Sequence, residues 1–307
     1  MEVMLDKTDP VDCPPIFIGG EGRSGTTLLS ILLNSHSDIA HGPELHFRGP
    51  KNLGSYILDM LDKRTESSNS DWEKYRLDEE MYAGFHFVNR CHRCGVSAEQ
   101  LRKIVTESIY STNSNLEEFA DRCNLINQIG IEMQLRKSCA RWGIKIMRDI
   151  RILNQYEEYW PNATFIHLVR DGRDVAASQI KDHSSWGYDD IERAANSWVN
   201  IIKKVRSFSA EYNIIEVRYE DVVQDTQKTM QDLLFKLGLS WEDSVLEHTR
   251  FPHALYQNPY GHPSINAVVK PINSDSVGRW KQELSKEDVK KWESFAGPVC
   301  EELGYET

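Results

Sequence analysis

The sequence of 307 residues has no apolar run that approaches the 18 residues of a membrane-spanning helix. Its six cysteines are few and irregularly spaced, which excludes a small domain held together by disulfides. Basic residues are fewer than acidic ones: the sequence has 36 Lys and Arg and 47 Asp and Glu, which gives a net charge of −11. This balance opposes non-specific binding to nucleic acid or to anionic membranes, so an anionic ligand needs a local site.

The N-terminal segment is acidic and has no apolar stretch like that of a secretory signal peptide. We therefore expect a cytoplasmic protein with reduced thiols. The hydrophobic share of 40% and the charged share of 27% are those of an ordinary globular protein, and no internal repeat is visible. We interpret residues 1–307 as a single domain, which is long enough to bury a large core.

Four short apolar runs bounded by turn or helix signals predict buried strands, at residues 16–20, 143–147, 164–169 and 214–218. Helical spacing lies between them, over residues 27–34, 152–159, 174–181, 191–212 and 226–237. Strands that are apolar on both faces and alternate with helices predict an α/β fold with a parallel sheet.

Two segments depart from this alternation. Residues 53–141 carry helical spacing without a convincing strand, which predicts a helical insertion beside the sheet. Residues 248–277 are rich in Pro, Asn, Ser, Tyr and His, a composition that supplies turns. Long irregular segments in compact domains commonly act as lids or binding loops, so we expect a lid-like loop here.

The strongest local signal is the segment 20–27, which reads GEGRSGTT between a predicted strand and a predicted helix. It matches the phosphate-binding loop GxxxxGK[ST], except that Thr26 stands where the lysine belongs. Backbone N–H groups of such a loop bind an anionic phosphate, whereas the missing ammonium disfavours ATP or GTP turnover. A nucleotide with a 5′-phosphate group and no γ-phosphate fits better. The alternative is a glycine turn that only joins a strand to a helix.

A second anion site is indicated after the predicted strand 164–169. Arg170 ends that strand, and Ser178 lies about two turns along the next predicted helix. A guanidinium and a hydroxyl in this arrangement can bind a second phosphate group, which suggests a ligand with phosphates at two ends. The alternative is a surface turn, RDGRD, whose charges pair with one another.

Together these two segments resemble the sulfotransferases that use 3′-phosphoadenosine 5′-phosphosulfate (PAPS) as donor. Further similar pieces are WGIKIMRD around Lys145, IIEVRYEDVVQD around Tyr219 and SVGRWKQELS from Ser276. The spacing is most similar to that of the tyrosylprotein sulfotransferases and their bacterial small-molecule relatives. The resemblance implies a P-loop type parallel sheet flanked by helices. It implies a donor site formed by Gly22, Arg23, Ser24, Gly25, Thr26, Thr27, Arg170, Ser178, Tyr219, Ser276, Gly278, Arg279 and Trp280.

Sulfuryl transfer needs a base for the acceptor and cations for the developing charge. The resemblance implies that Glu44, 21 residues after Arg23, is the base, although it could instead cap a helix or pair with Arg48. His46 is the second choice for the base. Arg23 and Lys145 are the implied stabilisers of the sulfonate and bridging oxygens, and we expect no metal ion.

Cys91 and Cys94 form a lone CxxC in the predicted insertion. A structural zinc site needs two further ligands at suitable spacing, and the other cysteines form no second pair. A metal site, a redox pair and two ordinary thiols remain open, with ordinary thiols favoured.

For the acceptor we expect a small, neutral or cationic hydroxyl or amine compound. A chain of charge −11 repels acidic tyrosine peptides unless a basic cleft intervenes, and no dense Lys/Arg stripe is visible. Aromatic and polar residues of the 248–277 loop suit a compact ring system. The first alternative is sulfation of protein tyrosines. The second, from another class, is a P-loop nucleoside kinase or nucleotide-binding regulator.

Overall fold

The computed structural model describes residues 13–45, 49–64, 79–181, 187–251, 253, 255 and 264–306. Five strands form a sheet in the order β2-β3-β1-β4-β5, and the pairs β2–β3, β1–β4 and β4–β5 are parallel. The strands are β1 (Ile16–Gly19), β2 (Ile39–Glu44), β3 (Arg141–Met147), β4 (Thr164–Val169) and β5 (Ile214–Arg218). The predicted α/β fold with a parallel sheet is confirmed, and each of the four predicted strands is present.

Strand β2 was not predicted from the sequence. Its residues read IAHGPE, and the Gly–Pro pair is a turn signal rather than a strand signal. The first four residues are nevertheless buried, and β2 pairs with β3 from Ile39 onward with an irregularity between His41 and Glu44. Burial against a partner strand therefore outweighs the local turn preference.

The chain divides into two compact units. Unit 1 consists of the described residues within 1–15, 30–145 and 247–269, and unit 2 of those within 16–29, 146–246 and 270–307. Helix α1 (Thr26–Ser35) begins in unit 2 and ends in unit 1. No described helix is long and apolar enough to cross a membrane.

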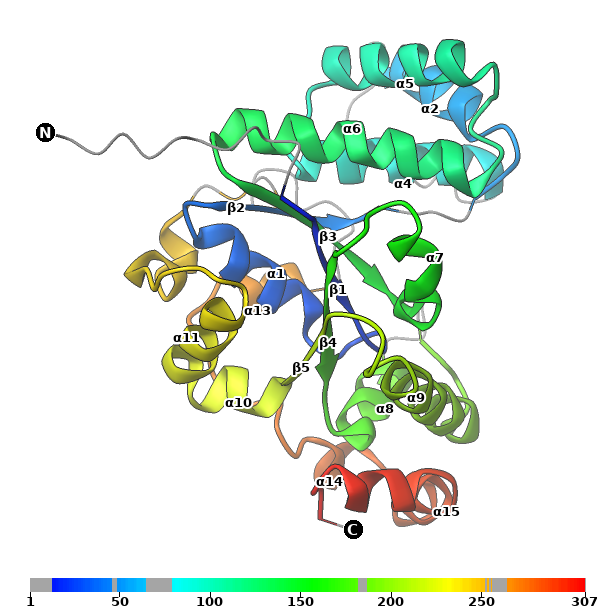
Figure 1. Ribbon diagram of the computed structural model, residues 1–307. Helices are drawn as coiled ribbons and strands as arrows, with labels where there is room; N and C mark the ends of the chain where they lie inside the picture. Colours follow the sequence, from blue (N-terminus) through cyan, green and yellow to red (C-terminus); the bar gives the residue numbers. More distant parts are fainter. Residues whose placement is uncertain are drawn as a thin grey trace, which may run out of the picture. The chain divides into compact units, whose positions relative to one another are not determined.

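The helices of unit 1 fill the segment between β2 and β3, where the sequence predicts a helical insertion. They are α2 (Leu53–Arg64), α4 (Glu79–Arg93), α5 (Ala98–Thr112) and α6 (Phe119–Lys137). Figure 1 shows them gathered together, and both α4 and α6 contact β2. Helix α5 starts at a capping box, in which Ser97 and Gln100 each bind the other's backbone N–H. The 248–277 loop contains the turn η3 (His248–Arg250) and the short helix α13 (Ile265–Val268).

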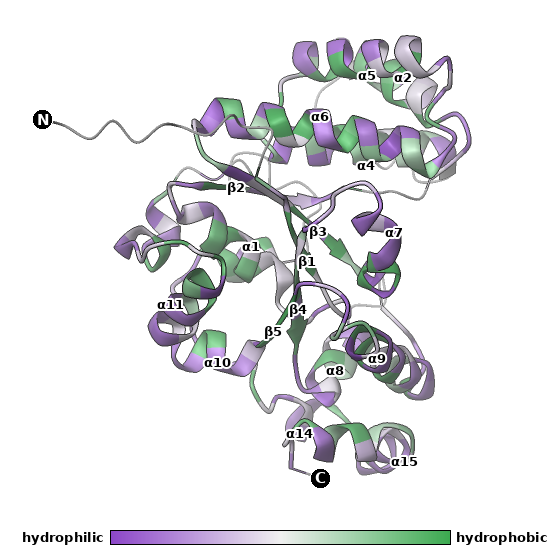
Figure 2. Cartoon of the chain, in the orientation of Figure 1, coloured by the Kyte–Doolittle hydropathy of each residue, from purple (hydrophilic) through white to green (hydrophobic). Residues whose placement is uncertain are grey.

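Unit 2 contains the remaining helices. They are η1 (Arg148–Ile152), α7 (Leu153–Glu157), α8 (Gly172–Lys181), α9 (Ile191–Arg206), α10 (Tyr219–Gln224), α11 (Thr226–Lys236), η2 (Asp243–Val245), α14 (Trp280–Glu283) and α15 (Lys286–Glu302). Helix α9 is two-sided in Figure 2, and its apolar stripe, which includes Trp198, packs on Trp292 of α15 with ring centroids 5.3 Å apart. It ends six residues before the predicted 212, because residues 207–212 form separate turns.

Candidate active site

The loop between β1 and α1 is shaped by two glycines of the phosphate-binding pattern. Gly20 has φ +151°, and a Cβ there would lie 2.4 Å from the carbonyl oxygen of Leu168. Gly25 has φ +95°, and a Cβ there would lie 2.4 Å from the Tyr219 ring. Side chains are therefore excluded at both positions, and α1 begins directly after Gly25. The first N–H groups of α1 consequently border the loop, as in other anion-binding loops.

Residues that the sequence predicts for the donor site meet beside this loop in unit 2. Arg23, in the left-handed backbone region at φ 75°, donates from Nε to Ser178 Oγ at 3.0 Å. Arg170 is buried and donates from Nη1 to the Arg23 carbonyl at 3.0 Å, with its guanidinium 4.4 Å from the centre of the Tyr219 ring. Strands β1, β4 and β5 and helix α8 thus bring four of the predicted residues together. A non-glycine residue at positive φ is a feature that recurs at functional sites.

The segment that precedes α14 is held against the same cluster. Arg170 Nη2 donates to the carbonyl of Ser276, and the buried carboxylate of Asp174 accepts the N–H groups of Gly278 and Trp280 at 2.8 and 2.9 Å. Burial raises the pKa of Asp174, and these two N–H groups and Arg170 oppose that shift. Asp174 is not among the residues predicted from the sequence, although it lies in the first turn of the helix that follows Arg170.

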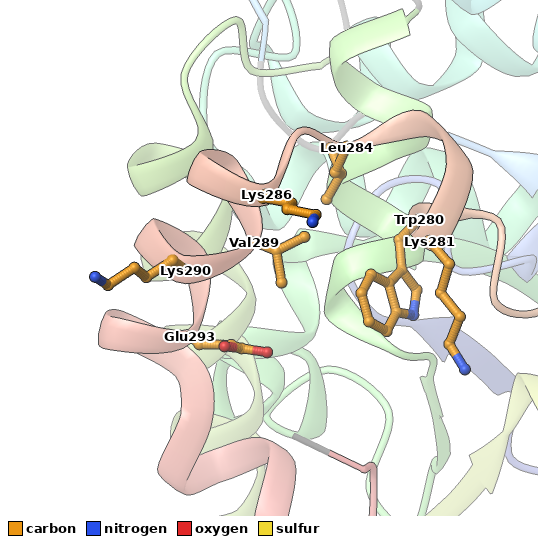
Figure 3. A pocket seen from close by; sticks show the side chains of 7 residues that line it. All are labelled: Trp280, Lys281, Leu284, Lys286, Val289, Lys290 and Glu293. Atoms are coloured by element: carbon orange, nitrogen blue, oxygen red, sulfur yellow. The ribbon is translucent and has the colours of Figure 1, made fainter.

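The side chains of Arg279 and Trp280 contact residues outside this cluster. The Arg279 guanidinium binds Glu283 at 2.6 and 2.8 Å, and the Trp280 ring lies 4.1 Å from the guanidinium carbon of Arg173. A surface pocket of about 260 Å³ adjoins Trp280, and Figure 3 shows Lys286 directed into it and Lys290 directed away. Its lining is Trp280, Lys281, Leu284, Lys286, Val289, Lys290 and Glu293. This pocket lacks Arg23 and Arg170, so it is not the predicted donor site.

The predicted base and one predicted stabiliser lie together in unit 1. Glu44 is the last residue of β2, and it is in register with Lys145 on β3. The Glu44 side chain is 23% exposed, whereas Lys145 is buried. Burial lowers the pKa of Lys145 to about 8, Glu44 opposes this shift, and the arginines of α4 add to it. His46 and Arg48 lie outside the described residues.

Two arginines that sequence analysis missed complete this group. Arg90 and Arg93 are three residues apart in the last turn of α4, and Arg90 Nη2 lies 3.9 Å from Glu44 Oε2. Burial lowers the pKa of Arg90, and it lowers the pKa of Arg93 to about 10 with a further contribution from Arg90. Arg90, Arg93 and the Glu44 carboxylate all influence Lys145, so three cations and one carboxylate gather here although the chain is acidic. The three-residue spacing of the two arginines is visible in the sequence and places them on one side of a helix. The strand end beside them is not visible in the sequence.

The CxxC at the end of α4, with Cys91 in the helix and Cys94 directly after it, contains two free thiols in this structure. Burial raises the pKa of Cys91 well above its usual value and that of Cys94 to about 12, so both are protonated thiols near neutral pH. Across the described part of the chain, no group of three or more His, Cys, Asp or Glu side chains is arranged to hold a metal ion.

The family model described as "Sulfotransferase family" matches residues 14–243, so the chain belongs to that family of enzymes. Protein-tyrosine sulfotransferase A of Caenorhabditis elegans is 26% identical over 95% of this chain and 67% of that protein. Protein-tyrosine sulfotransferase of Drosophila melanogaster is 25% identical over 96% of this chain and 52% of that protein. The chain thus spans between half and two thirds of these two relatives.

Similarity to solved structures agrees with this family. The sulfotransferase domain of the Synechococcus PCC 7002 olefin synthase superposes with a TM-score of 0.61 at 20% identity, over 92% of this chain and 94% of that domain. The sulfotransferase domain from the curacin biosynthetic pathway superposes with a TM-score of 0.50 at 18% identity, over 96% of this chain and 99% of that domain. At these identities the likeness shows a shared fold.

Proposed function

We propose that this enzyme transfers the sulfuryl group of PAPS to the phenolic hydroxyl of tyrosine in an acidic peptide. The observation that supports the donor best is the meeting of Arg23, Arg170 and Ser178, from three separate elements, beside the β1–α1 loop. The buried Nε of Arg170 has no hydrogen-bond partner among the described residues, which leaves a charged donor for a ligand oxygen. Arg170 and Ser178 would bind the 3′-phosphate, and the loop N–H groups the 5′-phosphosulfate.

The acceptor assignment rests on the charges around Glu44. Arg90, Arg93 and Lys145 create a positive field at the end of β2, and such a field attracts acidic sequences and repels cationic amines. It supplies the local basic site that net charge alone does not suggest. Relatives named protein-tyrosine sulfotransferase add to this choice. The small neutral or cationic acceptor expected from the sequence becomes the competing outcome of the test below.

The chemistry assigns one role to each group. Glu44 takes the proton of the acceptor hydroxyl, the acceptor oxygen bonds to sulfur, and the bond between sulfur and the 5′-phosphate oxygen breaks. Adenosine 3′,5′-bisphosphate leaves with the electron pair of that bond. Arg23 and Lys145 offset the charge that develops on the bridging and sulfonate oxygens.

The test is incubation with PAPS and a panel of acceptors, with mass spectrometry of the sulfonated products. The panel contains an acidic tyrosine peptide, the same peptide with Asp and Glu replaced by Asn and Gln, a Tyr→Phe control, and small neutral and cationic phenols and amines. We expect the acidic tyrosine peptide to be sulfonated most efficiently and the Phe control not at all. Efficient turnover of only the small neutral or cationic compounds would overturn the acceptor assignment. Binding of ATP with Mg²⁺ but not of adenosine 3′,5′-bisphosphate would overturn the donor assignment.

A further inference from the structure

Glu21 is a buried carboxylate inside the loop between β1 and α1. Its side chain is 1% exposed, and it accepts hydrogen bonds from Gly22 N–H at 2.8 Å, Gln179 Nε2 at 3.1 Å and Ser197 Oγ at 2.5 Å. Its fourth partner is Arg148, whose Nε lies 2.5 Å from Glu21 Oε1. Ser197 in turn accepts from the hydroxyl of Tyr188. The donor-site residues implied by the sequence include Gly22 but not Glu21, Arg148, Gln179, Ser197 or Tyr188.

Arg148, the first residue of η1, brings the opposite charge to Glu21. Its guanidinium is stacked 4.7 Å from the centre of the Tyr188 ring, which fixes its orientation. Its buried Nη2 has no hydrogen-bond partner among the described residues, and it lies 3.6 Å from where a Cβ on Gly22 would be. Arg148 is therefore directed at the first residue of the GRSGTT segment.

Both the N–H and the carbonyl group of Gly22 form hydrogen bonds within this network. Glu21 accepts its N–H, and Gln179 Nε2 donates to its carbonyl at 3.0 Å. The conformation of the loop at Arg23, the next residue, thus depends on a carboxylate. A carboxylate in an anion-binding loop is adverse, because its charge repels the ligand in a region where water screens little. The guanidinium of Arg148 forms an ion pair with Glu21 and offsets that charge.

We propose that Arg148 is a positioning residue for the donor, which acts by offsetting the charge of Glu21 so that the loop can be fixed by a carboxylate and still bind an anion. This inference rests on the proposed function, since it takes the ligand of the loop to be the 5′-phosphosulfate. Arg148 acts through Glu21 and need not contact the ligand. Its removal leaves an uncompensated buried carboxylate beside the bound anion, and the effect disappears when that carboxylate is also neutralised.

Calorimetry of adenosine 3′,5′-bisphosphate binding to the full chain tests this with a double-mutant cycle. Arg148→Met keeps the length of the side chain and removes its charge, and we expect binding to weaken by about tenfold or more. Glu21→Gln keeps the Oε1 acceptor and offers an amide to the Ser197 hydroxyl, so binding should remain at least as tight as in the wild type. The double variant should recover to within about threefold of the wild type.

A ligand without the 5′-phosphate provides the matched control. Adenosine 3′-phosphate places no anion in the loop, so Arg148→Met should leave its binding unchanged, whereas a merely misfolded variant would bind both ligands poorly. If Arg148→Met does not fold, Arg148→Lys, which keeps the charge, must bind near wild-type affinity. A double variant as weak as Arg148→Met would show direct contact and overturn the proposal, as would a tenfold loss in Glu21→Gln. Failure of the wild type to bind adenosine 3′,5′-bisphosphate would instead overturn the proposed function.

Discussion

The donor cluster of unit 2 and the Glu44 cluster of unit 1 are built in different ways. In the donor cluster Arg23 and Arg170 are tied by hydrogen bonds to a hydroxyl and to backbone carbonyls, with each bond near 3 Å or shorter. In the Glu44 cluster Arg90 Nη2 lies 3.9 Å from the carboxylate, and burial together with neighbouring cations lowers the pKa of Lys145 and of Arg93. The first arrangement suits the fixed binding of a doubly anionic ligand, and the second suits a group that must exchange a proton.

The largest expected effect is a loss of catalytic rate without a loss of donor affinity. Glu44→Gln preserves the size of the side chain and removes the proton acceptor, so kcat should fall by roughly 10² to 10⁴. Affinity for adenosine 3′,5′-bisphosphate should stay near that of the wild type, because Glu44 is outside the donor cluster. Rapid-quench or steady-state sulfonation assays beside calorimetry measure both quantities. An active Glu44→Gln, with activity lost in His46→Ala instead, would move the base to His46.

The next effect concerns the donor cluster alone. Arg170→Ala removes a buried charge-assisted donor and should weaken adenosine 3′,5′-bisphosphate by roughly 10- to 100-fold. Adenosine 5′-phosphosulfate has no 3′-phosphate, so its binding should change little. Equal weakening of the two ligands in calorimetry would mean that Arg170 supports the loop, through the Arg23 carbonyl, rather than binding the 3′-phosphate.

The smallest effect appears as a pH dependence of the Glu44 cluster. Because burial lowers the pKa of Lys145 to about 8, its positive charge is lost as the pH rises through 8, and kcat/KM should fall by about tenfold per pH unit above that value. Lys145→Arg stays charged and should move this alkaline limb upward by more than about one pH unit. An unchanged limb in Lys145→Arg would assign the limb to another group.

Thermal stability gives the control for this pH profile. The folded pKa of Lys145 is below the unfolded one, so the unfolded chain binds more protons between about pH 8 and 10.5. The contribution of this group to the free energy of unfolding therefore increases with pH over that window and is lost as the pH falls through 8. A fall in activity caused by Lys145 should consequently occur without a matching fall in Tm from the same group. Parallel losses of activity and Tm would indicate unfolding instead.

The parallel α/β fold and the β1–α1 loop could be predicted from the sequence. These follow from local signals, since an apolar strand, a glycine pattern and the next helix are contiguous in the chain. The glycine pattern is informative because Gly20 and Gly25 adopt backbone conformations that exclude other residues.

The distant residues that surround those motifs could not be predicted from the sequence, because they meet only in the folded chain. Strand β2 has a turn-like sequence and exists because burial beside β3 stabilises it, and Arg90 reaches Glu44 because α4 contacts β2. Arg148 meets Glu21 across 127 residues of sequence, and Asp174 holds Gly278 across 104. No local pattern encodes such pairs, because a buried charge finds its partner through the packing of whole elements.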